Sequence, residues 1–193
     1  MIISLETRTC VLRIGDSVQE DKNSGFTDKR ITLHAGMLAD GSYIQAYHDG
    51  MLHLKQEGMN KMTWDSPKPV TCATSNIRQV IVALQGGEII YFELNEFDQL
   101  NEIKKIFLGT EIISLAVADV PEERRIAPLL AVGLEDNYVR IFSLVTGNVL
   151  KAVSYQAVPA KPTSVLLVEM AASGGQGRQQ RRRLVRYKHA VFI

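Results

Sequence analysis

The stretch Val82-Ala-Leu-Gln-Gly-Gly-Glu-Ile-Ile-Tyr-Phe-Glu-Leu94 returns without a gap as Val132-Gly-Leu-Glu-Asp-Asn-Tyr-Val-Arg-Ile-Phe-Ser-Leu144. Val, Leu, Phe and Leu recur at the same places, and a turn dipeptide lies in the middle of each copy. Gly86-Gly87 and Asp136-Asn137 tolerate the positive φ of a two-residue type I′ turn. Strand-forming residues flank both dipeptides, so the repeat predicts two β-hairpins of one design.

A third hairpin of the same kind is predicted upstream. Residues 43–47 and 51–54 are apolar runs on either side of Asp49-Gly50. The three turns are therefore 37 and 50 residues apart. The mean of these steps is close to the roughly 40–45 residues of a four-stranded propeller blade.

The other strand-like segments fit a blade plan of this length. Further strands are predicted at residues 9–14, 32–38, 70–75, 99–108, 112–118, 148–153 and 164–170, and residues 15–30 are predicted to form a long polar loop. The predicted fold class is all-β, a partial β-propeller of about three to four blades. A closed propeller has about 4–8 blades, so the chain is short for this fold.

The composition is that of an ordinary globular protein. The 193 residues are 46% hydrophobic and 22% charged, which excludes collagen-like and wholly disordered chains. No apolar run approaches the ~18 residues that span a bilayer, so no membrane contact is expected. Charge appears too early at the N-terminus for a signal peptide. Two cysteines form no disulfide framework and suggest a reducing compartment.

Charge divides the chain into two predicted parts. Residues 171–193 hold six Lys and Arg and no acid, whereas residues 1–170 hold 16 bases against 21 acids, a net charge of −5. We therefore predict a partial β-propeller at residues 1–170 and a basic, non-propeller tail at residues 171–193.

No catalytic, cofactor-binding or metal-binding residues are predicted. The four histidines, His34, His48, His53 and His189, lie at no recognised zinc spacing. His48 and His53 flank one turn and could approach each other, but half-exposed strand and turn positions are the simpler interpretation. Cys10 and Cys72 are interpreted as small core residues, and the segment 122–125 (Glu-Glu-Arg-Arg) as a solvated loop tip.

Two features leave a choice between a structural and a binding role. Trp64, the only tryptophan, could fill the space between two blades or anchor a partner. The first role is favoured. The basic tail could bind phosphates, serve as a nuclear-import patch, or lie free in solvent.

The order of these elements resembles a known family. Residues 82–94, the segment Gln99-Leu-Asn-Glu102 and residues 130–141 are similar to the multi-propeller family of splicing factor 3b subunit 3. The family also includes the large subunits of the damaged-DNA-binding complex and of the cleavage and polyadenylation specificity factor. The segments 23–26, 62–67 and 156–170 fit the same pattern in the same order. The two turn dipeptides favour the splicing branch, whereas residues 171–193 match nothing in the family pattern.

The resemblance implies a fragment of the middle of three propellers, without enzymatic activity. It implies a nuclear scaffold in pre-mRNA splicing, within the U2 small nuclear ribonucleoprotein. The implied partners are the other splicing factor 3b subunits, a helical-repeat subunit and small companions. RNA would be contacted only indirectly, and no small-molecule substrate is expected. Which residues contact partners is unknown from the sequence.

Two alternatives stay open at this point. The chain could be a propeller scaffold of the damaged-DNA-binding, ubiquitin-ligase type, or an RNA-binding module acting through its basic tail. Because an open ring leaves blade edges unpaired, we also expect the isolated chain to be poorly soluble or loosely folded.

Overall fold

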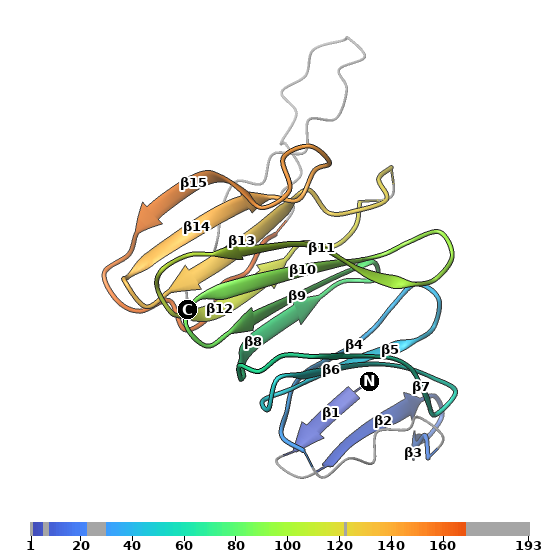
Figure 1. Ribbon diagram of the computed structural model, residues 1–193. Helices are drawn as coiled ribbons and strands as arrows, with labels where there is room; N and C mark the ends of the chain where they lie inside the picture. The colour runs from blue at the N-terminus through green and yellow to red at the C-terminus, as the bar shows by residue number, and fades with distance from the viewer. Residues whose placement is uncertain (1, 6–7, 23–29, 122, 169–193) are drawn as a thin grey trace, which may run out of the picture.

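Antiparallel sheets follow one another along the chain in the computed structural model, which describes residues 2–5, 8–22, 30–121 and 123–168 (Figure 1). An N-terminal sheet is followed by three four-stranded sheets, called the first, second and third blades. The N-terminal sheet contains β1 (Ile2–Leu5), β2 (Arg8–Ile14) and β3 (Val18–Glu20). The first blade contains β4 (Thr32–Met37), β5 (Tyr43–Tyr47), β6 (Met51–Gln56) and β7 (Met59–Asp65). The second contains β8 (Val70–Ser75), β9 (Gln79–Leu84), β10 (Glu88–Leu94) and β11 (Leu100–Phe107). The third contains β12 (Ile112–Val117), β13 (Leu129–Leu134), β14 (Tyr138–Ser143) and β15 (Lys151–Ala157).

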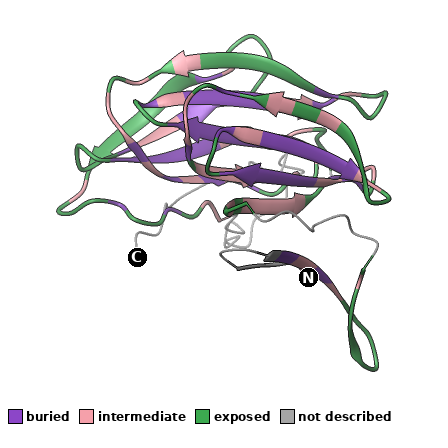
Figure 2. Ribbon diagram, turned by 60° about the horizontal axis from the view of Figure 1, so that its bottom comes forward, coloured by how far each residue is buried: buried purple, intermediate pink, exposed green. Residues whose placement is uncertain are grey.

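The blades stack face to face, so most of the core lies between them. One apolar cluster joins the first and second blades and includes Leu52, Leu54, Val82 and Phe92. A second cluster joins the second and third blades around Tyr91. Where both faces of a middle strand are covered, the strand reads as a nearly continuous apolar run rather than an alternating one, as in β9 and β13. In Figure 2 the buried residues accordingly gather in the middle strands, while the outer strands are largely exposed.

The three predicted hairpins are present, but their turns differ from the prediction. Each loop has three residues, at 48–50, 85–87 and 135–137, rather than two. Positive φ occurs at the last loop position in all three, namely Gly50 (100°), Gly87 (84°) and Asn137 (64°). A left-handed residue that ends a three-residue loop matches the twist of the strands as well as a type I′ turn does. The predicted type I′ geometry was therefore wrong, although the hairpins themselves were right.

A pair of β-bulges recurs in every blade. In the innermost strand the register skips Leu33, Thr71 and Ile113 in turn. In the outermost strand it skips Lys61, Ile103 and Val153. A bulge bends the strand and increases its right-handed twist. The repetition shows that the blades share one backbone design even where their side chains differ.

Three predicted segments differ from the structure or extend beyond it. The predicted loop 15–30 contains β3, which extends the β2 hairpin with three exposed residues. The segment around Trp64 forms the outermost strand β7, which had not been predicted. In the predicted strand at 164–170, the described residues show only an isolated bridge at Leu167, and residues 171–193 lie outside the described part.

Candidate interaction surfaces

The three histidines of the described chain, His34, His48 and His53, do not gather into a site. His34 lies on the innermost strand β4, where its Nε2 is hydrogen-bonded to Ser75 Oγ on β8 at 2.7 Å. Burial lowers the pKa of His34 to about 4, so the ring is neutral at physiological pH. His48 is exposed, whereas His53 is buried with its ring edge-on to Tyr47 at 5.1 Å, so the half-exposed interpretation was wrong for His53. His189 lies outside the described residues.

The cysteines and the charged loop behave as structural or surface groups. Cys10 and Cys72 are free and half-buried, and burial raises the pKa of the Cys72 thiol to about 12. A thiol of that pKa is a poor nucleophile near neutrality. In the loop 118–128, Glu123, Arg124 and Arg125 are exposed, as predicted for a solvated tip. Within residues 2–5, 8–22, 30–121 and 123–168, no three His, Cys, Asp or Glu side chains gather closely enough to hold a metal ion.

Trp64 fills the space between two blades, which confirms the favoured structural role. Its ring meets Phe92 of the second blade edge-on, with centroids 5.4 Å apart and planes at 81°. Its Nε1 donates to Glu102 Oε2 on β11 at 3.2 Å. Both contacts cross from the first blade to the second, so the indole is a clamp between them.

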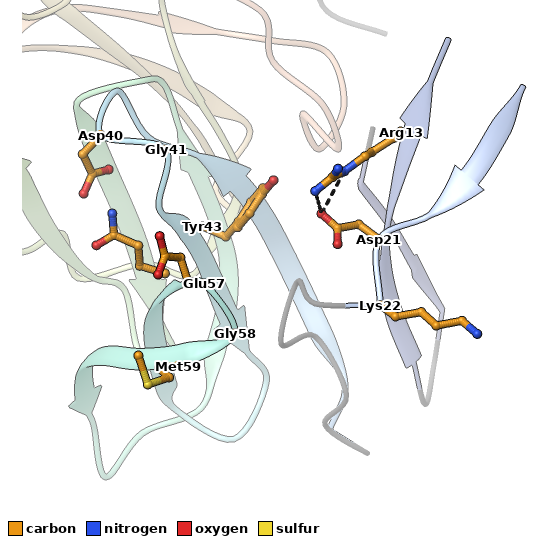
Figure 3. Close-up of a pocket in the computed structure, with 10 residues that line it drawn as sticks. Arg13, Asp21, Lys22, Asp40, Gly41, Tyr43, Glu57, Gly58 and Met59 are labelled. Carbon is orange, nitrogen blue, oxygen red and sulfur yellow. Dashed lines mark hydrogen bonds and ion pairs between the residues drawn. The ribbon is translucent and has the colours of Figure 1, made fainter. Parts of the chain in front are cut away.

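A polar hollow lies between the N-terminal sheet and the first blade (Figure 3). It measures about 780 Å³ and is lined by Arg13, Asp21, Lys22, Asp40, Gly41, Tyr43, Gln56, Glu57, Gly58 and Met59. Arg13 forms an ion pair with Asp21 at 2.9 Å. Burial alone would raise the pKa of Asp40, but hydrogen bonds from Ser42 and the nearby Lys61 outweigh it and lower that pKa. Asp40 is therefore held as a carboxylate by its partners, which does not suit a proton-transfer role.

The outermost strand of the third blade, β15, is an exposed edge of the sheet stack. All seven residues of β15 are exposed, and Tyr155 is 74% exposed with its ring 6.3 Å from that of Tyr138. In the second blade, the matching strand β11 packs the half-buried Ile106 against the apolar cluster shared with the third blade. On the face of the third blade that points away from the second blade, Val165 and Leu167 pack with Ala131 and Val139 in a small apolar cluster.

Phe97 is a surface feature that the sequence analysis did not select. It lies in the loop 95–99 between β10 and β11 and is 82% exposed, the highest value among the exposed large hydrophobic residues of the described chain. The signal was present in Asn95-Glu-Phe-Asp-Gln99, which places one aromatic residue in the middle of a polar turn. An aromatic side chain held at a turn is a frequent anchor in protein interfaces.

The arrangement suits contacts between proteins better than chemistry on a small molecule. The described part of the chain offers edges, loop tips and a polar hollow, and it contains no helix capable of crossing a bilayer.

Comparison with known proteins agrees with this arrangement. Residues 1–186 match the family described as the RSE1/DDB1/CPSF1 second beta-propeller, so the match extends past residue 170, where the sequence resemblance had been expected to end. Splicing factor 3B subunit 3 of Danio rerio is 37% identical over 172 residues, covering 88% of this chain and 14% of the relative. Spliceosome-associated protein 130 A of Arabidopsis thaliana is 36% identical over 91% of this chain and 14% of its own length. Pre-mRNA-splicing factor RSE1 of Pyricularia oryzae is 38% identical over 91% and 15%.

Solved structures show the same fold at low sequence identity. The β-propeller domain of Cps50 (Swd1) from Myceliophteria thermophila superposes with a TM-score of 0.65 at 12% identity, covering 86% of this chain and 58% of that domain. BBS1N, in complex with ARL6DN, gives a TM-score of 0.64 at 16% identity, covering 86% and 48%. These neighbours confirm the propeller fold, and their partial coverage agrees with an incomplete ring.

Proposed function

The chain belongs to the RSE1/DDB1/CPSF1 second-β-propeller family, and on that basis we propose that it acts as a non-catalytic scaffold segment in pre-mRNA splicing. The observation that carries the proposal is 36–38% identity to named splicing factors over about nine tenths of the chain. The names of these relatives describe splicing factors rather than enzymes, which agrees with the prediction of a non-enzymatic chain. The match to a second propeller also agrees with the predicted middle propeller.

The chain spans only 14–15% of the length of these relatives. The binding partners of a full-length splicing factor are therefore assigned to this chain only as a proposal. We propose contacts with other splicing factor 3b subunits, namely a helical-repeat subunit and small companions, and a location in the nucleus. RNA would be reached only through those partners, because residues 1–170 carry net charge −5 and phosphate binding favours the opposite sign.

The mechanism would be surface complementarity on a rigid frame. Blades clamped by Trp64 and by apolar clusters hold their loops in fixed positions, so partner contacts would lose little conformational entropy on forming. Rigid elements that carry variable loops are a common arrangement for binding surfaces.

Co-purification tests the proposal directly. The tagged 193-residue chain would be expressed in cells and isolated, and U2 small nuclear RNA and splicing factor 3b subunits would be quantified against a tagged unrelated propeller. Enrichment of both supports the scaffold role. Enrichment of ubiquitin-ligase subunits without splicing components would favour the damaged-DNA-binding alternative and contradict the proposal.

Filter binding of purified RNA separates the third possibility, an RNA-binding module. The intact chain would be compared with a full-length variant in which all six Lys and Arg residues of the tail are replaced by Gln, namely Arg178, Arg181, Arg182, Arg183, Arg186 and Lys188. Tight binding by both proteins would show that the acidic part contacts RNA directly, which contradicts the scaffold proposal. Tight binding lost in the variant would support the tail-dependent alternative instead.

A further inference from the structure

Phe97 is displayed by a loop that is ordered before any partner arrives. Asn95 Oδ1 accepts hydrogen bonds from the backbone N–H groups of Phe97 (2.8 Å) and Gln99 (3.0 Å). The Asn95 N–H donates to the Gln99 carbonyl at 2.9 Å and closes the turn. Asp98 adopts φ 55°, a left-handed conformation that Asp tolerates better than most residues. The exposed phenyl ring therefore stands on a fixed support.

A second loop is tied to the first. Arg125, in the loop 118–128 between β12 and β13, pairs with Glu96 at 2.5 Å. The base of that loop is held by the fully buried Gln79, whose Oε1 accepts from the Ala127 N–H at 2.7 Å. Gln79 Nε2 donates to the Ala127 carbonyl at 3.1 Å. We call residues 95–99, 118–121 and 123–128 together the Phe97 rim, and the contacts that hold these loops lower the entropic cost of binding there.

The Phe97 rim is acidic. Its described residues include four acids, Glu96, Asp98, Asp119 and Glu123, against Arg124 and Arg125. An occupant that fits it must be basic and must also offer apolar groups to the phenyl ring of Phe97.

One segment of this chain has that chemistry. We propose that residues 181–188 of the basic tail, Arg-Arg-Arg-Leu-Val-Arg-Tyr-Lys, dock on the Phe97 rim of the same molecule. Five cations would meet the acids of the rim, while Leu184, Val185 and Tyr187 are available to pack around Phe97.

The tail starts within reach of the rim. Val165 and Leu167, close to the end of the described chain, pack against Ala116, Ala131 and Val139 of the third blade. Ala116 lies on β12 and Ala131 on β13, the two strands that the loop 118–128 connects. Twenty residues separate 168 from 188, and an extended chain of that length spans up to about 70 Å. A tethered segment also meets its site at a high effective concentration, commonly in the millimolar range.

This contact goes beyond the proposed scaffold role, because the chain's own tail would then compete with a partner for the Phe97 rim. A partner with the same basic and apolar chemistry would have to displace the tail. The contact does not depend on splicing, so the two proposals can fail independently.

Zero-length carbodiimide crosslinking of the intact chain tests the docking, since it joins a lysine amine to a carboxylate in direct contact. Lys188 is the only lysine in residues 169–193. We expect Lys188 to couple to Glu96, Asp98 or Glu123 within one molecule, with a yield independent of protein concentration. A mixture of isotope-labelled and unlabelled chains distinguishes crosslinks within a molecule from those between copies.

Phe97→Ala is the decisive variant and Phe107→Ala is its matched control. Phe107 is 68% exposed at the other end of β11, so it tests for a general effect of removing a surface aromatic. We expect Phe97→Ala to lower the Lys188 crosslink yield about fivefold or more, as loss of an interface anchor does, and Phe107→Ala to leave it unchanged. Asp98→Asn, which preserves tolerance for the left-handed turn, should lower the yield at Glu96 and Glu123 as well.

Three results would overturn the docking. They are equal coupling of Lys188 to Glu111 or Asp136 at the opposite edge of the blades, crosslinks found only between copies, and a yield that Phe97→Ala does not change. Circular dichroism of each variant confirms that the fold is retained.

Discussion

The contact between the first and second blades can be tested by removing the Phe92 ring. Phe92 has 0% exposure and lies in the apolar cluster that joins these two blades. Trp64 rests edge-on against it at 5.4 Å. Phe92→Ala therefore empties part of the junction and leaves the indole of Trp64 without its aromatic neighbour.

The expected cost of Phe92→Ala is about 3–5 kcal/mol in the free energy of unfolding, the usual range for a buried Phe cut to Ala. Loss of the edge-to-face pair accounts for about 0.5–1.5 kcal/mol of that. Trp64→Phe should cost less, because a phenyl ring keeps much of the packing and loses chiefly the hydrogen bond to Glu102. Phe107→Ala should change stability by no more than about 0.5 kcal/mol, because its side chain is largely exposed.

Trp64 makes the assay specific, because it is the only tryptophan in the chain. Urea unfolding at low micromolar protein would be followed by its fluorescence and by circular dichroism. Phe92→Ala should lower the midpoint and shift Trp64 emission to the red under native conditions, because water reaches the indole. An equal loss in Phe92→Ala and Phe107→Ala, or an unchanged native emission in Phe92→Ala, would refute the packing of Trp64 and Phe92 between these two blades.

Three other predictions concern single positions. Gly87→Ala should destabilise the fold clearly more than Gly86→Ala in urea unfolding, because both have positive φ but only at Gly87 would a Cβ strike backbone, that of Thr110; equal losses would contradict the close approach. Because the folded pKa of His34 is lowered to about 4, the unfolded chain takes up the proton first, so its contribution to stability is complete above about pH 6.5 and declines as the pH falls toward 4. His34→Gln should flatten the melting temperature over that window, and an unchanged pH profile would argue against a neutral buried imidazole. The open edge at β15 should make the chain self-associate in sedimentation velocity, and Tyr155→Lys should reduce this; a sharp two-state melt from a monomer of the original chain would contradict the open-ring interpretation.

The positions of many strands could be predicted from the sequence, because a strand of a blade is specified by residues that are neighbours in the chain. Residues 43–47 and 88–94, for example, were predicted as strands and match β5 and β10. Continuous apolar runs and loop dipeptides carry that information, and both act over a few residues. β7 was missed because an outermost strand packs on one side only, so Met59–Asp65 lacks a continuous apolar run.

Turn geometry and side-chain roles needed the folded chain. Whether a loop has two or three residues depends on the strand register, which made His48, Gln85 and Glu135 loop residues. The display of Phe97 likewise depends on hydrogen bonds to Asn95 and on the Arg125–Glu96 pair, which joins loops of two different blades. No local pattern specifies such a contact between blades.

The sequence by itself determined the all-β class, the blade-length repeat, the hairpins and the contrast between an acidic body and a basic tail. These follow from periodicity and composition, which are properties of neighbouring residues. Only the tertiary structure decided that Trp64 clamps two blades, that His34 is held neutral, and that Phe97 stands exposed on an ordered rim. The reason is that a blade buries its faces only against the next blade, so the role of a side chain depends on residues about forty positions away.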